Sequence, residues 1–180
     1  MFQDLLLPVL VLISLADAMT LNDCPSDLAR DHSLQIYKNS CFQFVLDHHR
    51  DYPEANKDCK RHGGTLALTK TKDVQDFLVG QLEHTYHHGS VVWIGLTDMV
   101  KEDTYVWEDG TVLGPNDFKH WASGRLLHQF DDCAALDPSE NGLWYDYPCE
   151  SHLFGLISAE KSYVCEYKMQ VASPTPPVEG

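Results

Sequence analysis

Val91-Val92-Trp93-Ile94-Gly95-Leu96 is the stretch of the chain that decides its fold. A run of Val, Trp, Ile and Leu with almost no polar residue is typical of a strand covered on both faces. Gly95 adds a position where another segment of backbone can come close. The stretch therefore predicts a buried central strand. Helical sequence precedes it and loop-rich sequence follows it, so a binding site is expected in the second half of the chain.

The sequence on either side of this strand predicts two helices and several short strands. Residues 52–64 have a helix start at Pro53 and a helix stop at Gly63, and their apolar residues share one face. The apolar spacing of residues 73–84 predicts a second helix. A hairpin is expected around Lys38-Asn39-Ser40. Further short strands are expected at residues 65–69, around Trp107, at residues 133–136 and at residues 162–167.

The first eighteen residues have the features of a secretory signal peptide. An apolar run from Leu5 to Ile13 precedes Ala16-Asp17-Ala18, which fits a small-x-small cleavage site. The run is short for a membrane span. The formal net charge of the whole chain is −14, which makes nucleic acid a poor partner. We therefore expect a secreted, extracellular protein without a membrane span or a nucleic-acid ligand.

Six cysteines follow the signal segment. An even number in an oxidising compartment predicts three disulfides, although spacing alone leaves fifteen pairings open. None of the cysteines forms a C-x-x-C pair, which argues against a zinc ribbon or a redox motif. No nucleophile and base, or pair of carboxylates, occurs in a recognised catalytic spacing, so the chain is not expected to be an enzyme.

Several landmarks follow one another in a fixed order. They are Gly63-Gly64-Thr-Leu-Ala, Trp93-Ile-Gly-Leu, Trp107-Glu-Asp-Gly, Trp121, Asp132-Cys133, Gly142-Leu-Trp144-Tyr-Asp146, Cys149 and Cys165-Glu166. In this order they resemble the long form of the C-type lectin-like domain. The resemblance implies an α+β fold with two helices, two small antiparallel sheets and a long loop region. It also implies the disulfide pairs Cys24–Cys41, Cys59–Cys165 and Cys133–Cys149.

The expected domain boundaries combine the resemblance with the signal features at the start and the Pro-rich composition at the end. We expect a signal peptide at 1–18, an N-terminal extension at 19–23, a C-type lectin-like domain at 24–168 and a Pro-rich tail at 169–180. Two departures from the family are visible. Tyr52 stands where the family usually has Trp, and the insert at 150–164 is longer than in typical members.

The resemblance places a calcium and sugar site in the long loop region. Sugar-binding members hold Ca²⁺ with a Glu-Pro-Asn or Gln-Pro-Asp triplet after the Trp that matches Trp121, an acid before the Asp-Cys pair, and a Trp-Asn-Asp triplet. Here the first triplet is absent, and Tyr145 replaces the Asn of the last. Asp131 and Asp146 remain as candidate metal ligands, too few oxygens for useful affinity. No cofactor is therefore expected, with Ca²⁺ kept as the alternative.

Two other metal sites are weaker candidates. Glu166 matches a separate structural calcium position of some relatives, but its usual partners are here Thr71 and Gln75. His84 and His88 could share a helix face and chelate a transition metal, although Gly89 indicates that the helix ends there. Neither site is expected to bind an ion.

A cation and several apolar or aromatic side chains occupy the positions of the family's binding loop. That composition is typical of a protein-contact patch. We call the set the long-loop face; its members are Arg125, Leu126, Leu127, Phe130 and Tyr145.

Three functions are compatible with this sequence. The leading one is a secreted, calcium-independent C-type lectin-like binding module that recognises an extracellular protein or glycan through the long-loop face. The second is an acidic structural protein of the extracellular matrix or of a biomineral, because the chain is strongly acidic. The third is a calcium-dependent, carbohydrate-binding lectin with a site rebuilt around Asp131 and Asp146.

Overall fold

The structure, a computed structural model, describes residues 19–123, 131–151 and 158–170. Within these ranges no helix is long and apolar enough to cross a membrane. The helical elements are η1 (Leu21–Asp23), α1 (Tyr52–Arg61), α2 (Lys72–Gly80), the π-helix η2 (Gln81–Thr85) and η3 (Pro138–Glu140). The strands are β1 (Leu34–Tyr37), β2 (Ser40–Arg50), β3 (Thr65–Leu66), β4 (Val92–Thr97), β5 (Val106–Trp107), β6 (Cys133–Asp137), β7 (Leu143–Tyr147) and β8 (Lys161–Lys168).

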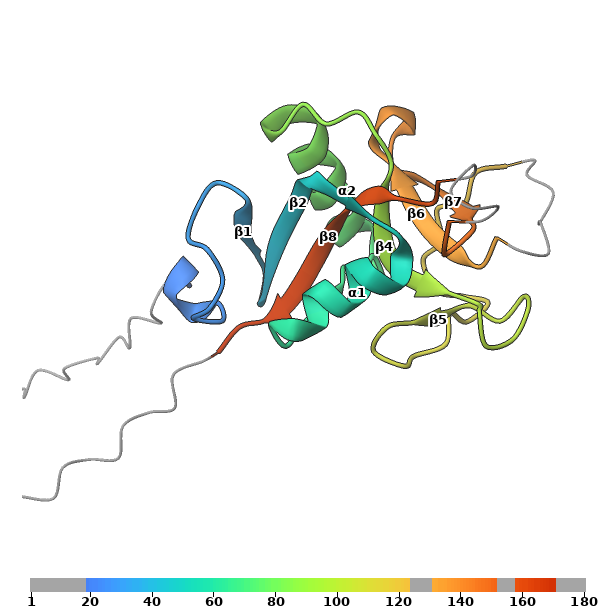
Figure 1. Cartoon of the computed structure of the whole chain (residues 1–180), viewed down its shortest axis with the longest axis horizontal. Coiled ribbons are helices and arrows are strands. Elements are labelled where there is room, and N and C mark those ends of the chain that lie inside the picture. The colour runs from blue at the N-terminus through green and yellow to red at the C-terminus, as the bar shows by residue number, and fades with distance from the viewer. Residues whose placement is uncertain (1–18, 124–130, 152–157, 171–180) are drawn as a thin grey trace, which may run out of the picture.

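The strands form one mixed sheet (Figure 1). Its order is β1-β2-β8-β4-β6-β7, with β3 beside β8 and β5 beside β4. The β4–β8 pair is parallel, with Val92 opposite Ser162 and Trp93 opposite Tyr163, and the other pairs are antiparallel. The α+β class with two α-helices is confirmed. The two antiparallel sheets expected from the sequence are corrected to a single mixed sheet, because the β4–β8 pair joins them.

The central strand predicted from the sequence is β4. Its residues from Val92 to Leu96 are all buried. The Gly95 N–H donates to the Ala67 carbonyl at 2.8 Å, and the Gly95 carbonyl accepts from the Glu108 N–H at 2.9 Å. A Cβ on Gly95 would collide with the carbonyl oxygen of Leu66. The close backbone approach expected at this glycine is therefore confirmed.

The first helix begins at Tyr52 and ends just before Gly63, as the sequence predicts, whereas the second changes its type before its predicted end. Asp51 caps α1, and its side chain accepts from the Glu54 N–H. Tyr52, Ala55 and Cys59 are buried on the inner face, as expected. The second predicted helix changes its hydrogen bonding after Gly80, where α2 gives way to the π-helix η2. The apolar period continues through both helical types, so hydropathy alone did not reveal the change.

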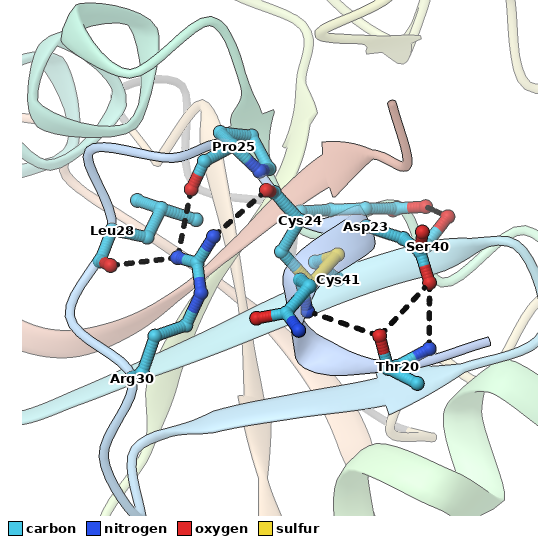
Figure 2. Close-up of a disulfide and its surroundings, with 10 residues drawn as sticks. Thr20, Asp23, Cys24, Pro25, Leu28, Arg30, Ser40 and Cys41 are labelled. Atoms are coloured by element: carbon cyan, nitrogen blue, oxygen red, sulfur yellow. Dashed lines mark hydrogen bonds between the residues drawn. A yellow bond between two sulfur atoms is a disulfide. The ribbon is translucent and has the colours of Figure 1, made fainter. Parts of the chain in front are cut away.

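Three disulfides connect distant parts of the chain. They are the pairs implied by the family resemblance: Cys24–Cys41, Cys59–Cys165 and Cys133–Cys149. Around the first of them, the Arg30 guanidinium donates to the carbonyl oxygens of Cys24, Pro25 and Leu28 at 2.7 to 2.9 Å (Figure 2). Arg30 therefore gathers the N-terminal loop into a compact turn beside β1 and β2.

A buried side-chain amide connects α2 to the beginning of β7. The Gln75 side chain, 2% exposed, donates to the Gly142 carbonyl at 2.6 Å and accepts from the Trp144 indole N–H at 2.9 Å. Trp144 is fully buried. Because unpaired polar groups are costly in such an interior, these bonds fix the position of β7 relative to α2.

Substitution of Gly142 tests this packing. Gly142 has φ 77°, and a Cβ there would collide with the side chains of Gln75 and Val79. Gly110 has a similar φ of 86° but has open space around its Cβ position. We expect Gly142→Ala to lower the free energy of unfolding by about 3 kcal/mol or more, and Gly110→Ala by only about 1 kcal/mol. Denaturant titration of both variants measures the difference. Equal losses of unfolding free energy would contradict the tight packing of Gln75 between α2 and β7.

Candidate functional site

An aromatic cluster lies beneath the beginning of the long loop. The ring centroids of Tyr105 and Trp121 are 4.7 Å apart, and those of Trp121 and Trp144 are 5.5 Å apart. Trp93, Trp107 and Trp144 are at most 3% exposed and belong to the core, whereas Trp121 is half-buried. Trp121 thus connects the core to the surface at which the long loop starts.

Asp98 directly follows the central strand and is the most buried carboxylate of this region, at 4% exposure. One of its oxygens accepts from the Asp103 N–H at 2.9 Å, and its other oxygen is buried without a hydrogen-bond partner. Burial raises the pKa of Asp98 to about 6, and the charges of Asp132, Glu102 and Asp146 add to the increase. Asp98 is therefore a buried carboxylate in an acidic environment, although Met99 and Val100 after it are 49% and 95% exposed.

Tyr105 connects this acidic region to β7. Burial, followed by the charge of Asp146 and a hydrogen bond to it, raises the pKa of Tyr105 well above its ordinary value. The tyrosine therefore stays neutral, and its hydroxyl is the hydrogen-bond donor toward the carboxylate of Asp146, which is 7% exposed. Asp146 is thus held by a neutral hydroxyl inside the domain.

Tyr145, assigned to the long-loop face, and Asp146, a candidate metal ligand, lie on opposite sides of β7. Burial alternates along β7, so Trp144 and Asp146 point to its inner face while Tyr145 points to the other. The Tyr145 hydroxyl donates to the Glu140 carboxylate. Asp131 is half-buried just before β6. The remaining members of the long-loop face, at positions 125, 126, 127 and 130, lie outside the described residues.

A comparison of the whole chain with protein-family models gives one decisive match. The model described as Lectin C-type domain matches residues 48–167, which is more than half of the chain. The chain belongs to the C-type lectin domain family. Members of this family are generally non-enzymatic binding modules.

Individual relatives agree with the family assignment. The chain is 28% identical over 148 residues to the versican core protein of Rattus norvegicus, covering 82% of this chain and 5% of that protein. It is 28% identical over 122 residues to human tetranectin, covering 66% of this chain and 55% of tetranectin. A solved calcium-independent type II antifreeze protein has the same fold, with a TM-score of 0.61, 20% identity, and coverage of 78% of this chain and 95% of that one.

C-type lectin domains often bind Ca²⁺. Calcium takes six to eight oxygen ligands. In the part of the chain that the structure describes, no three Asp, Glu, His or Cys side chains converge as a metal-binding group. Tyr105 donates to Asp146, and the Asp103 N–H donates to Asp98. The donors in these ranges do not make a complete calcium site, and ligation by Asp131 and Asp146 stays a prediction.

The two weaker candidate sites are built differently from a metal site. The Glu166 carboxylate accepts from the Ser40 hydroxyl at 2.8 Å and from the Leu68 N–H at 2.9 Å, so both of its oxygens serve the fold. The π-helix η2 lies between the regular helix and His88, which lines a cavity with residues of β2, whereas the side chain of His84 is 81% exposed beside Glu83. The helix-face geometry considered for the two histidines is therefore replaced by a helix end.

Asp98, Glu102 and Tyr105 belong to this region but were not selected from the sequence. The motifs compared there lie between Trp121 and Asp146, whereas these residues lie in the loop after β4. A usable signal was present, because Asp98 directly follows the apolar run of the central strand. An acid at the end of a buried strand is expected to be partly desolvated, and that desolvation is what makes Asp98 unusual.

The raised pKa of Asp98 predicts a pH dependence of stability. Between about pH 4 and pH 6 the folded protein holds a proton on Asp98 that the unfolded chain has already released, so the free energy of unfolding falls as pH rises through this window. In calcium-free buffer, we expect the free energy of unfolding of wild type to fall by about 1 to 3 kcal/mol across this window because of Asp98. The Asp98→Asn variant should not show this fall. Asp76→Asn, at an exposed carboxylate of α2, is the matched control. Identical pH slopes in wild type and Asp98→Asn would contradict the burial effect.

Proposed function

We propose that this chain is a secreted binding module that recognises an extracellular protein or glycan, without calcium, through the long-loop face. The observation that carries the proposal is the pairing of an intact lectin scaffold with the absence of the Glu-Pro-Asn or Gln-Pro-Asp triplet after Trp121. The residues that replace the triplet offer a guanidinium and two leucine side chains instead of oxygen ligands. Such groups suit contact with a protein or a glycan surface better than ion binding.

The described surroundings of the loop support this proposal. The Tyr105 hydroxyl interacts with Asp146, so this carboxylate has a partner within the protein. The Gln75–Trp144 hydrogen bond and the Cys133–Cys149 disulfide hold β6 and β7, the strands that follow the loop. A rigid base reduces the entropy cost of presenting a binding loop. The calcium-independent antifreeze protein provides a precedent for this fold without the ion.

A second candidate is an acidic structural protein associated with matrix or mineral. The net charge of −14 favours it, as does the mutual proximity of Asp98, Glu102, Asp132 and Asp146 at one end of the domain. The net negative charge of the chain attracts cations and basic proteins over distances limited by the Debye length. This function depends on charge, whereas the leading proposal depends on the apolar residues of the long-loop face, so the two are separable.

Substitution of the two leucines tests the leading proposal. We expect the labelled mature protein to bind members of a panel of printed glycans and purified extracellular proteins in EDTA, and Leu126→Asp with Leu127→Asp to weaken that binding at least tenfold, because a charge would replace each apolar contact. Met19→Asp with Val112→Asp makes the same change in charge at residues that are 55% and 57% exposed. These controls should bind as wild type does.

Two results would contradict the proposal. One is binding that requires added calcium, which would favour the lectin with a rebuilt site. The other is unchanged binding by the leucine variant with its melting temperature intact. Retention on calcium carbonate that survives the leucine substitutions and falls with salt would instead favour the acidic structural protein.

A further inference from the structure

A short segment after η2 closes one side of a cavity at the β1–β2 edge of the sheet. The cavity, of about 490 Å³, has as its floor the part of β2 that continues past β1, and residues 31–33 form its other wall. We call the short segment, residues 86–88, the edge segment. In the strand order, β1 and β2 form one edge of the sheet and β6 and β7 the other (Figure 1). The edge segment is therefore separate from β7, which carries Tyr145.

Hydrogen bonds and a ring contact hold the edge segment in place. The His88 N–H donates to the Leu82 carbonyl at 2.7 Å, and the Tyr86 hydroxyl donates to the His32 carbonyl at 2.6 Å. The Tyr86 ring packs against the ring of Phe44 in β2, with the two centroids 4.8 Å apart. The edge segment therefore connects the end of the helical region to β2 and to the opposite wall of the cavity.

The backbone on both sides of the edge segment allows it to move separately from the sheet. The π-helix η2 precedes it, and His87 within it has φ 51°, a left-handed conformation that is uncommon outside glycine. Gly89, which follows, has open space around its Cβ position and does not pack against the domain. The segment thus lies between an irregular helical turn and an unpacked residue. It can leave β2 without disturbing β4, which begins at Val92.

The edge segment carries a histidine with a buried, unpaired ring nitrogen. Within the described residues, no group forms a hydrogen bond with the Nε2 atom of His88. A neutral imidazole has one nitrogen without a proton, so this atom can remain an unpaired acceptor. A protonated imidazole carries an N–H on both nitrogens, and here one of them would be a charged donor without water or an acceptor. The closed position of the edge segment therefore favours the neutral ring of His88.

The charges around His88 do not reverse this preference. Burial lowers the pKa of His88, the charge of His49 lowers it further, and the opposite charge of Asp47 offsets only part of these effects. Both of these neighbours belong to β2. The other titratable side chains around the edge segment are Asp31, His32, His48, Glu83, Tyr86 and His87. Because histidines gain positive charge as pH falls, acid adds like charges beside His88.

We propose that protonation of His88 releases the edge segment from β2 in mildly acidic solution. In the released segment the ring reaches water and takes up a proton at the ordinary histidine pKa of about 6.5. In the closed segment protonation requires a lower pH, so below about pH 6.5 the released form binds more protons than the closed form. The free energy that keeps the segment closed therefore falls as pH decreases.

Release of the edge segment changes this edge of the sheet. It removes the Tyr86 ring from Phe44 and breaks the bond from the Tyr86 hydroxyl to the His32 carbonyl. The part of β2 that continues past β1 then loses its cover. The proposal goes beyond ligand recognition by the long-loop face and does not depend on it.

The experiment is amide hydrogen exchange of the mature protein at pH 7.5 and pH 5.0, corrected for the intrinsic exchange rate at each pH. The Tyr86 and His88 amides donate to backbone carbonyls and are therefore protected in the closed segment. We expect their protection to fall between about threefold and thirtyfold at pH 5.0, the upper figure being the limit for one histidine. The Gly95 amide in β4 is the internal reference. It should lose no protection, because Asp98 changes stability in the opposite direction.

Two matched variants assign the response to one ring. His88→Gln removes the titrating group and should make the protection of Tyr86 independent of pH. His84→Gln removes an imidazole whose side chain is 81% exposed and should leave the response unchanged. The ring proton on Cε1 of His88 in the wild-type protein provides a measurement without any substitution, and it should titrate below about pH 6.5.

Each of three results would overturn the proposal. The first is equal protection of the Tyr86 and His88 amides at the two pH values, which would mean that the ring titrates without release of the backbone. The second is a pH response that survives His88→Gln. The third is a loss of protection at Gly95 as large as that at His88, which would indicate unfolding of the whole domain.

Discussion

The rest of the structure depends on the parallel pairing of β4 with β8. This contact joins a strand from the middle of the chain to the last strand, and the Cys59–Cys165 disulfide, with a sequence separation of 106 residues, holds β8 to α1 beside it. A disulfide that closes so long a loop stabilises by about 4 to 5 kcal/mol in the loop-entropy model. Gly95 lets β4 also pack closely against the backbone of Leu66 and Ala67, because it has no side chain to separate them. These contacts hold together the sheet that also contains β6 and β7.

Much of the fold could be predicted from the residues, because each element carries a local signal. Pro53 and Gly63 delimit a helix, and the apolar run around Trp93 gives a buried strand. What local signals do not contain is pairing between distant strands. The β4–β8 pair, which joins the two expected sheets into one, is such a case. The cavity at the β1–β2 edge is another, because its walls come from segments about fifty residues apart.

The site was predictable only in part, for a different physical reason. Motif comparison identifies residues by type, whereas burial and hydrogen bonding decide what a carboxylate does. The motif makes Asp146 a metal candidate, and ligation by it stays a prediction; its burial and its interaction with Tyr105 are visible only in the structure. Asp98 was not selected, yet its burial gives it the raised pKa. Tyr145 and Asp146 are neighbours in sequence but lie on opposite faces of β7. Side-chain environment therefore has to be known before a role can be assigned.

Calcium independence is the central claim, and a thermal melt of the oxidised mature protein in millimolar CaCl₂ and in EDTA tests it most directly. A site whose Kd lies a hundredfold below the added calcium must raise the free energy of unfolding by about 2.7 kcal/mol. We predict the same melting temperature in both buffers. A rise of several degrees with calcium, abolished by Asp98→Asn or Asp131→Asn, would contradict the claim and would place an ion among the acidic residues beside the long loop.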